Sequence, residues 1–197
     1  RLYEICAPKP GAEGVSLSAY LAEEGTLEEL KEFAVHRSAY QLKEADPHTW
    51  ALPRLSGTAK AAMVEIQADE YGAGIERDMH QTLFAVTMSE LGLDTGYNAY
   101  LPHLPGVSLA TTNLVSYFGL HRRLRGALVG HLALFEMTSV EPMGRYSVAL
   151  RRHGAGDDEA LPALLTHLQV AVREAGLDPI PAPDALAGAF AQALMAQ

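Results

Sequence analysis

Carboxylates and a histidine stand close together in the segment 64–84, where they interrupt a pattern of apolar residues. On an ideal helix, with about 100° between residues, Asp69, Glu76 and His80 fall on one side. Asp69 and His80 are eleven positions apart, and Glu76 and His80 are four apart. Carboxylate oxygens combined with an imidazole nitrogen suit iron or manganese better than copper or structural zinc. The segment therefore indicates a site for such an ion.

Glu70 offers a different pairing within the same segment. It lies ten positions before His80, roughly 80° around an ideal helix. Gly72 and Gly74 stand between the two residues and allow a local distortion of the backbone, which would change that angle. The spacing alone leaves open which carboxylate faces His80.

Glu136 interrupts an apolar stretch that runs from Leu128 to Met137. Burial of an unpaired charge costs on the order of several kcal/mol or shifts the pKa of the group. We therefore expect Glu136 to be paired or bound to a cation.

Two further segments carry residues of the same kind. Glu44 ends a helical pattern before Pro47, and His167 is followed seven positions later by Glu174. Carboxylates and imidazoles that project inward from facing helices of a bundle form non-haem di-iron and di-manganese sites. Each such residue taken alone is also compatible with a solvated helix face. The metal interpretation depends on their occurrence on separate helices.

The elements that must position these residues are helices. Thr26 and Glu29 have the spacing of a capping box at a helix start, whereas Pro47 and Pro53 interrupt helical hydrogen bonding. No segment shows the alternating pattern of a strand. We expect one all-α domain over residues 1–197, arranged as a bundle. The expected helical segments are 16–45 (two helices), 56–92, 109–152 with breaks near Gly119 and Pro142, 156–176 and 183–197.

The composition narrows the classes of function. With 197 residues, 48% of them hydrophobic, the chain can form one continuous core. Its formal net charge of -9 argues against a general affinity for nucleic acid. The one basic cluster, residues 121–125, is compatible with a solvated helix end or with an anion site. Cys6 is the single cysteine, so an internal disulfide and cysteine-rich metal sites are excluded.

The remaining features bear on location and assembly. No apolar run approaches the roughly 18 residues of a membrane span, and the first residues do not form a signal peptide. We therefore expect a cytoplasmic protein without a membrane partner. The alanine-rich segment 185–197 offers a face of small residues that could form a homodimer or pack on its own bundle.

Three segments, 36–74, 79–94 and 113–139, resemble the iron-containing redox enzymes of the haem-oxygenase-like di-iron oxidase superfamily. The resemblance extends over roughly residues 34–152. It implies a haem-oxygenase-like bundle of about seven helices that binds two iron ions, Fe(II) or Fe(III), and no haem. It also implies an enzyme that activates O2 to oxidise a small amino-acid-derived or fatty-acid substrate. The metal ligands that it implies are Glu44, Glu70, His80, Glu136 and His167.

The sequence departs from the family pattern at three positions. Arg77 stands where the family has a carboxylate, and Ala171 and Glu174 stand where it has Asp and His. Two interpretations therefore remain: a di-iron oxidase, or a variant with one iron or none. The second would be a cofactor-independent or haem-binding enzyme, with His80 as acid/base or haem ligand, or a non-catalytic binding protein.

Overall fold

The computed structural model describes residues 16–155, which form seven α-helices and five short 3-10 helices and, within that range, no strand. The α-helices are α2 (Leu17–Glu23), α3 (Leu27–Gln41), α4 (Asp46–Thr49), α5 (Gly57–Glu70), α6 (His80–Glu90), α7 (Gly106–Leu120) and α8 (Arg125–Arg152). The 3-10 helices are η1 (Leu52–Arg54), η2 (Gly72–Gly74), η3 (Glu76–Asp78), η4 (Leu101–His103) and η5 (Arg122–Leu124). The all-α prediction is confirmed.

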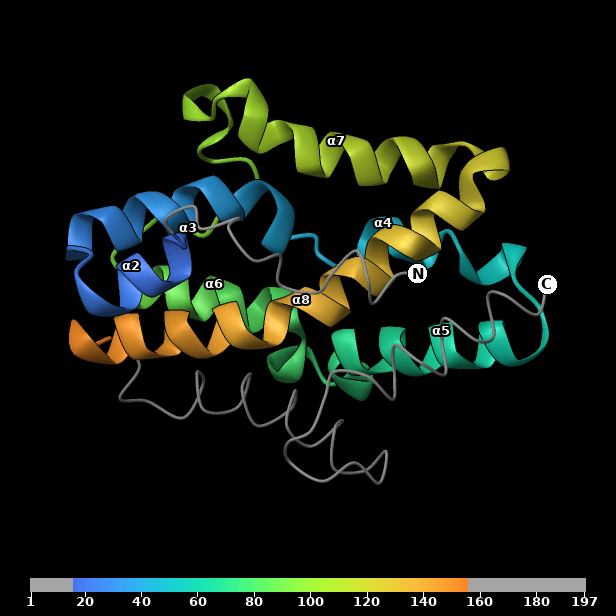
Figure 1. Ribbon diagram of the computed structural model, residues 1–197, viewed down its shortest axis with the longest axis horizontal. Helices are drawn as coiled ribbons and strands as arrows, with labels where there is room; N and C mark the ends of the chain where they lie inside the picture. Colours follow the sequence, from blue (N-terminus) through green and yellow to red (C-terminus); the bar gives the residue numbers. More distant parts are fainter. Residues whose placement is uncertain (1–15, 156–197) are drawn as a thin grey trace, which may run out of the picture.

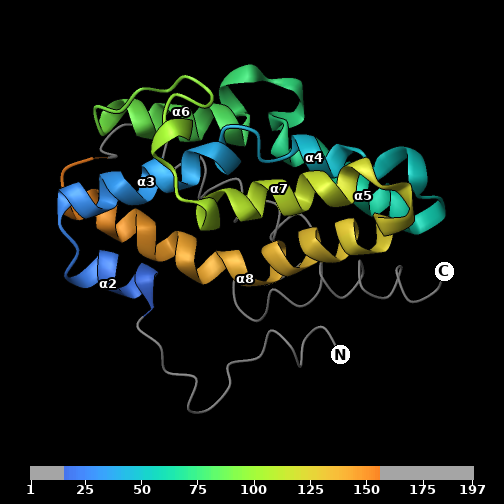
Figure 2. The same cartoon turned by 90° about the horizontal axis from the view of Figure 1, so that it is seen from above.

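The longest helix, α8, runs across the described part of the molecule (Figure 1). Both α2 and α7 pack on α8, and α3 packs on α6 and α7. In the perpendicular view, α6, α3 and α8 follow one another as layers at the end of the molecule that carries α2 (Figure 2). The space among these layers is where the ionisable residues meet.

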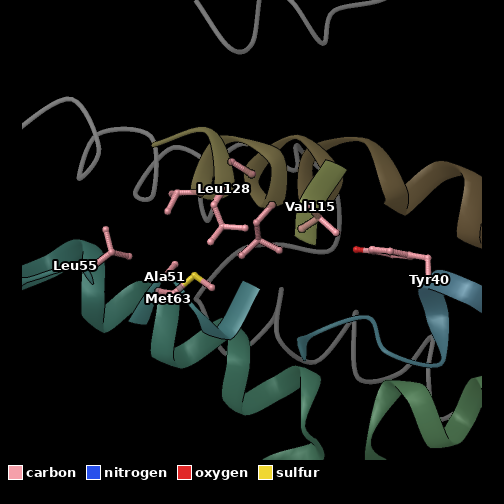
Figure 3. Close-up of a cluster of buried hydrophobic side chains, with 9 residues drawn as sticks. Tyr40, Ala51, Leu55, Met63, Val115 and Leu128 are labelled. Carbon is pink, nitrogen blue, oxygen red and sulfur yellow. The ribbon is translucent and has the colours of Figure 1, made fainter. Parts of the chain in front are cut away.

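Two clusters of buried hydrophobic side chains form the core. The first, shown in Figure 3, consists of Tyr40, Ala51, Leu55, Met63, Val115, Leu128, Val129, Leu132 and Ala133. The second consists of Leu21, Leu30, Ala34, Leu91, Ala149 and Leu150. On α8 the two clusters are separated by the stretch 134–148. Glu136 lies in that stretch, so the gap between the clusters leaves room for a polar site.

The start of α3 follows the sequence prediction. Thr26 is its N-cap, and the Thr26 hydroxyl accepts a hydrogen bond from the backbone N–H of Glu29 at 3.3 Å. In return, Oε2 of Glu29 accepts one from the backbone N–H of Thr26 at 2.8 Å. These two bonds satisfy donors that would otherwise lack a partner at the helix end.

The prediction of one continuous helix through residues 64–84 was wrong. α5 ends at Glu70, η2 and η3 follow, and α6 begins at His80 (Figure 1). Gly72 has a φ of +57°, and a Cβ there would lie 2.5 Å from the carbonyl carbon of Asp78. Only glycine fits this conformation and this close approach. The turn therefore depends on Gly72, and apolar periodicity does not reveal it.

Two prolines also behave differently from the prediction. Pro142 lies inside α8 and does not end it, since the missing N–H removes one hydrogen bond from a long helix held by its packing on α2 and α7. Pro47 lies in the first turn of α4, where no intrahelical N–H bond is lost. The helices expected over 156–176 and 183–197 lie outside the described residues. Among the helices between residues 16 and 155, none has both the length and the apolar content to cross a membrane.

Candidate metal centre

Three of the residues expected to bind metal come together in space. Glu44 lies in the bend between α3 and α4, Glu70 is the last residue of α5, and His80 is the first residue of α6. One donor atom from each of the three lies within 4.8 Å of the others. Nδ1 of His80 is 3.0 Å from Oε2 of Glu70, and the two side chains are only 6% and 13% exposed. The chain thus gathers two carboxylates and an imidazole in a largely buried position.

Burial and a neighbouring carboxylate raise the pKa of two acids at this site, Glu44 and Glu136. Burial raises the pKa of Glu44 well above its ordinary value, and the neighbouring Glu70 raises it further. Burial also raises the pKa of Glu136 to about 7, with a smaller contribution from Glu70. For His80, burial lowers the pKa, but the carboxylates of Glu70 and Glu44 outweigh it and bring the pKa to about 9. The carboxylates outnumber the imidazole, so Glu44 and Glu136 retain protons that a bound cation would displace.

Two buried polar atoms of the cluster indicate that a metal ion fits. Among the described residues, neither Oε2 of Glu70 nor Nε2 of His80 has a hydrogen-bond partner. A buried polar atom without a partner costs about 1 to 3 kcal/mol. Oε2 of Glu70 and Nδ1 of His80 form an ion pair at 3.0 Å. Two ligands about 2.1 Å from one ion, at a right angle, are also about 3.0 Å apart.

The other two expected ligands are placed differently. Glu136, on α8, lines the same cavity as the three clustered residues but does not belong to the three-residue group. His167 lies outside the described residues, as do Ala171 and Glu174. The described part of the chain therefore gathers three candidate donors and holds a fourth on the facing helix.

The grouping of Asp69, Glu76 and His80 on one helix face was wrong. Glu76 lies exposed in η3, because the helix ends at Glu70 and the backbone turns there. Asp69 is partly buried and close enough to raise the pKa of His80. Arg77 is 86% exposed, and its Nε lies 3.6 Å from Oδ1 of Asp78. Arg77 is therefore a solvent-exposed cation that does not obstruct the cluster.

Sequence reasoning missed two residues that support Glu44. Nε2 of Gln41 donates a hydrogen bond of 3.0 Å to Oε2 of Glu44. Nη2 of Arg37 in turn donates one of 2.8 Å to Oε1 of Gln41. The four-residue spacing of Arg37 and Gln41 was visible in the sequence, but Glu44 lies beyond the end of α3. The bend after Gln41 turns the carboxylate of Glu44 back toward Gln41.

Tyr71 connects the segments that carry the two carboxylates. Its hydroxyl donates a hydrogen bond of 3.0 Å to Oδ1 of Asp46 and lies 2.9 Å from Oγ1 of Thr49. Asp46 and Thr49 belong to α4, which follows Glu44, and Tyr71 follows Glu70 directly. This link holds the end of α5 against the start of α4.

The clustered residues open onto a cavity of about 140 Å³ among α3, α5, α6 and α8. Its walls are mainly apolar and include Leu30, Phe33, Phe84, Leu91, Leu132, Phe135, Met143 and Leu150. Its polar lining comprises Arg37, Tyr40, Gln41, Glu44, His48, Gln67, Glu70, His80, Thr87, Glu136, Ser139, Tyr146 and Ser147. A cavity with a mainly apolar surface, onto which polar groups converge, is typical of a small-molecule site.

Comparison with known proteins agrees with this arrangement. The sequence model of a family described as iron-containing redox enzymes matches residues 31–170. Nitrosourea synthase of Streptomyces achromogenes subsp. streptozoticus is 30% identical over 110 residues, which cover 56% of this chain and 23% of that enzyme. The aligned part of the chain thus spans about a quarter of the relative's length. The three clustered residues and Glu136 all fall inside the family match.

Proposed function

We propose, because the chain belongs to the family of iron-containing redox enzymes, that it is a non-haem iron oxidase or oxygenase that activates O2. Membership of this family makes the chain an iron-dependent oxidoreductase with an all-α haem-oxygenase-like fold. The observation that carries the proposal is the convergence of Glu44, Glu70 and His80 within 4.8 Å on the wall of one cavity. Its substrates would be O2 and a small organic molecule.

The proposed ligands are Glu44, Glu70 and His80, with Glu136 and His167 completing a site for two iron ions and no haem. Anionic oxygen donors support this choice, because they stabilise the higher oxidation states of iron. Bound iron supplies the one-electron steps that O2 chemistry requires. Gln41 fixes the orientation of Glu44, and the apolar walls exclude water from the reacting groups.

The family resemblance and the name of the relative support a proposal for the substrate class. The relative is named for the synthesis of a nitrosourea, a nitrogen-containing product. We therefore place oxidation of an amino-acid-derived compound first and oxidation of a fatty acid second. The alanine-rich segment 185–197 also makes a homodimer part of the proposal.

A single-iron or metal-depleted variant of the same fold is the second candidate. Within residues 16–155, three donors form one group, and Glu136 lies apart from it. Arg77, where the resemblance implies a carboxylate, is a surface residue. These observations are the specific support for the single-iron variant.

The test is metal analysis of protein purified without oxygen and reconstituted with Fe(II), followed by admission of O2. Two irons per chain with an oxygen-dependent transient absorbance support the di-iron oxidase, and one iron supports the variant. Protein that takes up no iron contradicts both iron sites and leaves only the metal-depleted variant. Glu136→Gln is expected to lower the iron content if Glu136 is a ligand. Glu141→Gln, an exposed position on the same helix, is the matched control and should leave the content unchanged.

A further inference from the structure

Arg37 is a cation on the wall of the cavity that holds the candidate metal centre. Among the described residues that line this cavity, it is the one arginine or lysine. It has no ion pair with any carboxylate between residues 16 and 155, and of its five donor N–H groups one bonds to Gln41. Its guanidinium carbon lies 5.6 Å from the ring centre of Tyr40. The side chain is thus held in place with donors left over.

The guanidinium lies close to the metal centre. Its charge partly offsets the rise that burial causes in the pKa of Glu44 and of Tyr146, which belong to different walls of the cavity. The two hydrogen bonds through Gln41, with the amide between them, place Nη2 of Arg37 within about 8 Å of Oε2 of Glu44. A molecule bound to Arg37 at one end therefore reaches the metal centre with atoms only a few bonds away.

We propose that Arg37 binds a carboxylate of the substrate and so determines which of its atoms reaches the metal centre. This inference rests on the proposed function. A guanidinium matches a carboxylate with two parallel N–H···O bonds, which are stronger than neutral hydrogen bonds. Gln41 and Tyr40 hold Arg37 in advance, so less side-chain freedom is lost when the ligand binds.

The cavity also limits the size of that acid. Its volume of about 140 Å³ is close to that of a cavity that accommodates benzene, on the order of 150 Å³. A substrate of about six to ten non-hydrogen atoms fits this space. The described cavity therefore favours a small acid of amino-acid size over a long-chain fatty acid.

A merely structural role for Arg37 would look different. If Arg37 only oriented Gln41 and Glu44, its removal would weaken iron binding. It would also lower the affinity for acids and for neutral molecules alike. If it binds a carboxylate, its removal lowers affinity for acids and spares neutral molecules of the same shape. The preference for an acid over its own amide separates these roles.

The experiment measures binding of straight-chain acids from butanoate to octanoate, and of their amides, to Fe(II)-loaded protein by calorimetry without oxygen. Wild type is expected to bind at least one acid tenfold or more tightly than its amide. Arg37→Gln should lower the affinity for that acid about 30-fold and change the affinity for its amide by no more than about twofold. Arg37→Lys should keep part of the preference, because it keeps the charge but loses the planar fork. Arg122→Gln, which removes an exposed arginine, should behave as wild type.

Iron content, measured in every sample, separates this proposal from the proposed function. Acid preference that survives in Arg37→Gln overturns the role of Arg37, and so does a wild type that binds no acid better than its amide. Equal losses for acid and amide, with less iron bound, would show that Arg37 acts only through Gln41. Wild type that takes up no iron but binds acids more tightly than their amides would contradict the proposed function and support the anion site at Arg37.

Discussion

His80 and His48 line the same cavity and are both buried, with 6% and 1% exposure, yet their pKa values move in opposite directions. Burial lowers the pKa of each. At His80 the carboxylates of Glu70 and Glu44 outweigh burial and raise the pKa to about 9. At His48 the neighbouring His131 adds to the effect of burial, and the pKa falls to about 3. Burial therefore sets the low pKa of His48, whereas the neighbouring carboxylates override burial at His80.

The two imidazoles also differ in what the protein leaves them to bind. Nε2 of His48 lies 3.2 Å from Nδ1 of His131, and His48 also hydrogen-bonds to the backbone of Glu44. Nε2 of His80 has no partner among the described residues, and its Nδ1 is paired with Glu70, itself a proposed ligand. His48 is therefore a structural histidine with its bonds complete, whereas His80 has free coordination capacity.

The largest expected effect comes from removing the carboxylate that makes His80 different. Glu70→Ala deletes a proposed ligand and leaves His80 in surroundings more like those of His48. We expect iron affinity to fall by about 100-fold or more, because loss of even an outer-sphere partner costs about 10- to 100-fold. Metal titration under anaerobic conditions measures the change.

Glu76→Ala is the matched control for this change. Glu76 is the exposed glutamate in η3 that a helical wheel groups with His80. We expect wild-type iron affinity for this variant. If Glu76→Ala and Glu70→Ala lose affinity equally, the turn at Gly72 does not bring Glu70 to the metal.

The next effect concerns the turn itself. A Cβ at Gly72 would lie 2.5 Å from the carbonyl carbon and 2.7 Å from the nitrogen of the peptide that joins Asp78 to Met79. Gly72→Ala should lower the free energy of unfolding by about 3 kcal/mol or more, because a backbone clash adds to the cost of a positive φ. Chemical denaturation measures the loss, and metal titration should show weaker iron binding.

Gly74→Ala separates the clash from the backbone conformation. Gly74 also has a positive φ, +85°, but a Cβ there would have no neighbouring atom within 4 Å. We expect a loss of about 1 to 2 kcal/mol, the cost of the conformation alone. Equal losses at both glycines would show that the close approach at Gly72 is relieved without cost.

The sequence predicted much of the fold and less of the site. Helical periodicity and the Thr26 cap predicted the all-α class, because both are local properties. The resemblance selected Glu70 and His80, which the structure places 3.0 Å apart. The helical wheel selected Glu76 because it assumes a continuous helix. The close approach of Gly72 to Asp78, where the helix is interrupted, cannot be read from helical periodicity.

Arg37 and Gln41 show why the rest of the site could not be predicted. Residues four apart on a helix are neighbours in every helical protein, so their spacing carries no information about function. What matters is that α3 ends at Gln41 and that the chain bends, which turns Glu44 back onto Gln41. The facing wall comes from α8, about a hundred positions later in the chain, and its placement depends on packing.

The opposite shifts of the two histidines predict opposite responses of the metal-free protein to pH. The pKa of His80 rises from 6.5 to about 9 on folding, so the stability that it contributes below pH 6.5 is lost as the pH rises to 9. The raised pKa of Glu136, about 7, acts in the same direction from pH 4.5 upward. The lowered pKa of His48 reduces stability as the pH falls from 6.5 towards 3.

Denaturant unfolding of metal-free protein between pH 6.5 and 8.5 tests the alkaline side. We expect the free energy of unfolding to fall by at least about 1 kcal/mol per pH unit. Glu70→Gln should flatten this slope, since His80 then loses the charge that raises its pKa, whereas Glu76→Gln should retain it. A slope that is unchanged in Glu70→Gln would mean that Glu70 does not hold the proton on His80.

The smallest expected effect is at the partner of His48. His131→Leu removes the second cause of the low pKa of His48 but leaves the first, burial, in place. We expect the pKa to rise slightly and to stay below 6.5, with about 1 kcal/mol of stability lost with the hydrogen bond. NMR titration of His48 measures the pKa, and His121→Leu, at an exposed position, is the control. A return of His48 to its ordinary pKa would show that the charge of one neighbour, rather than burial, sets the low value, and would extend to His48 the rule that holds at His80.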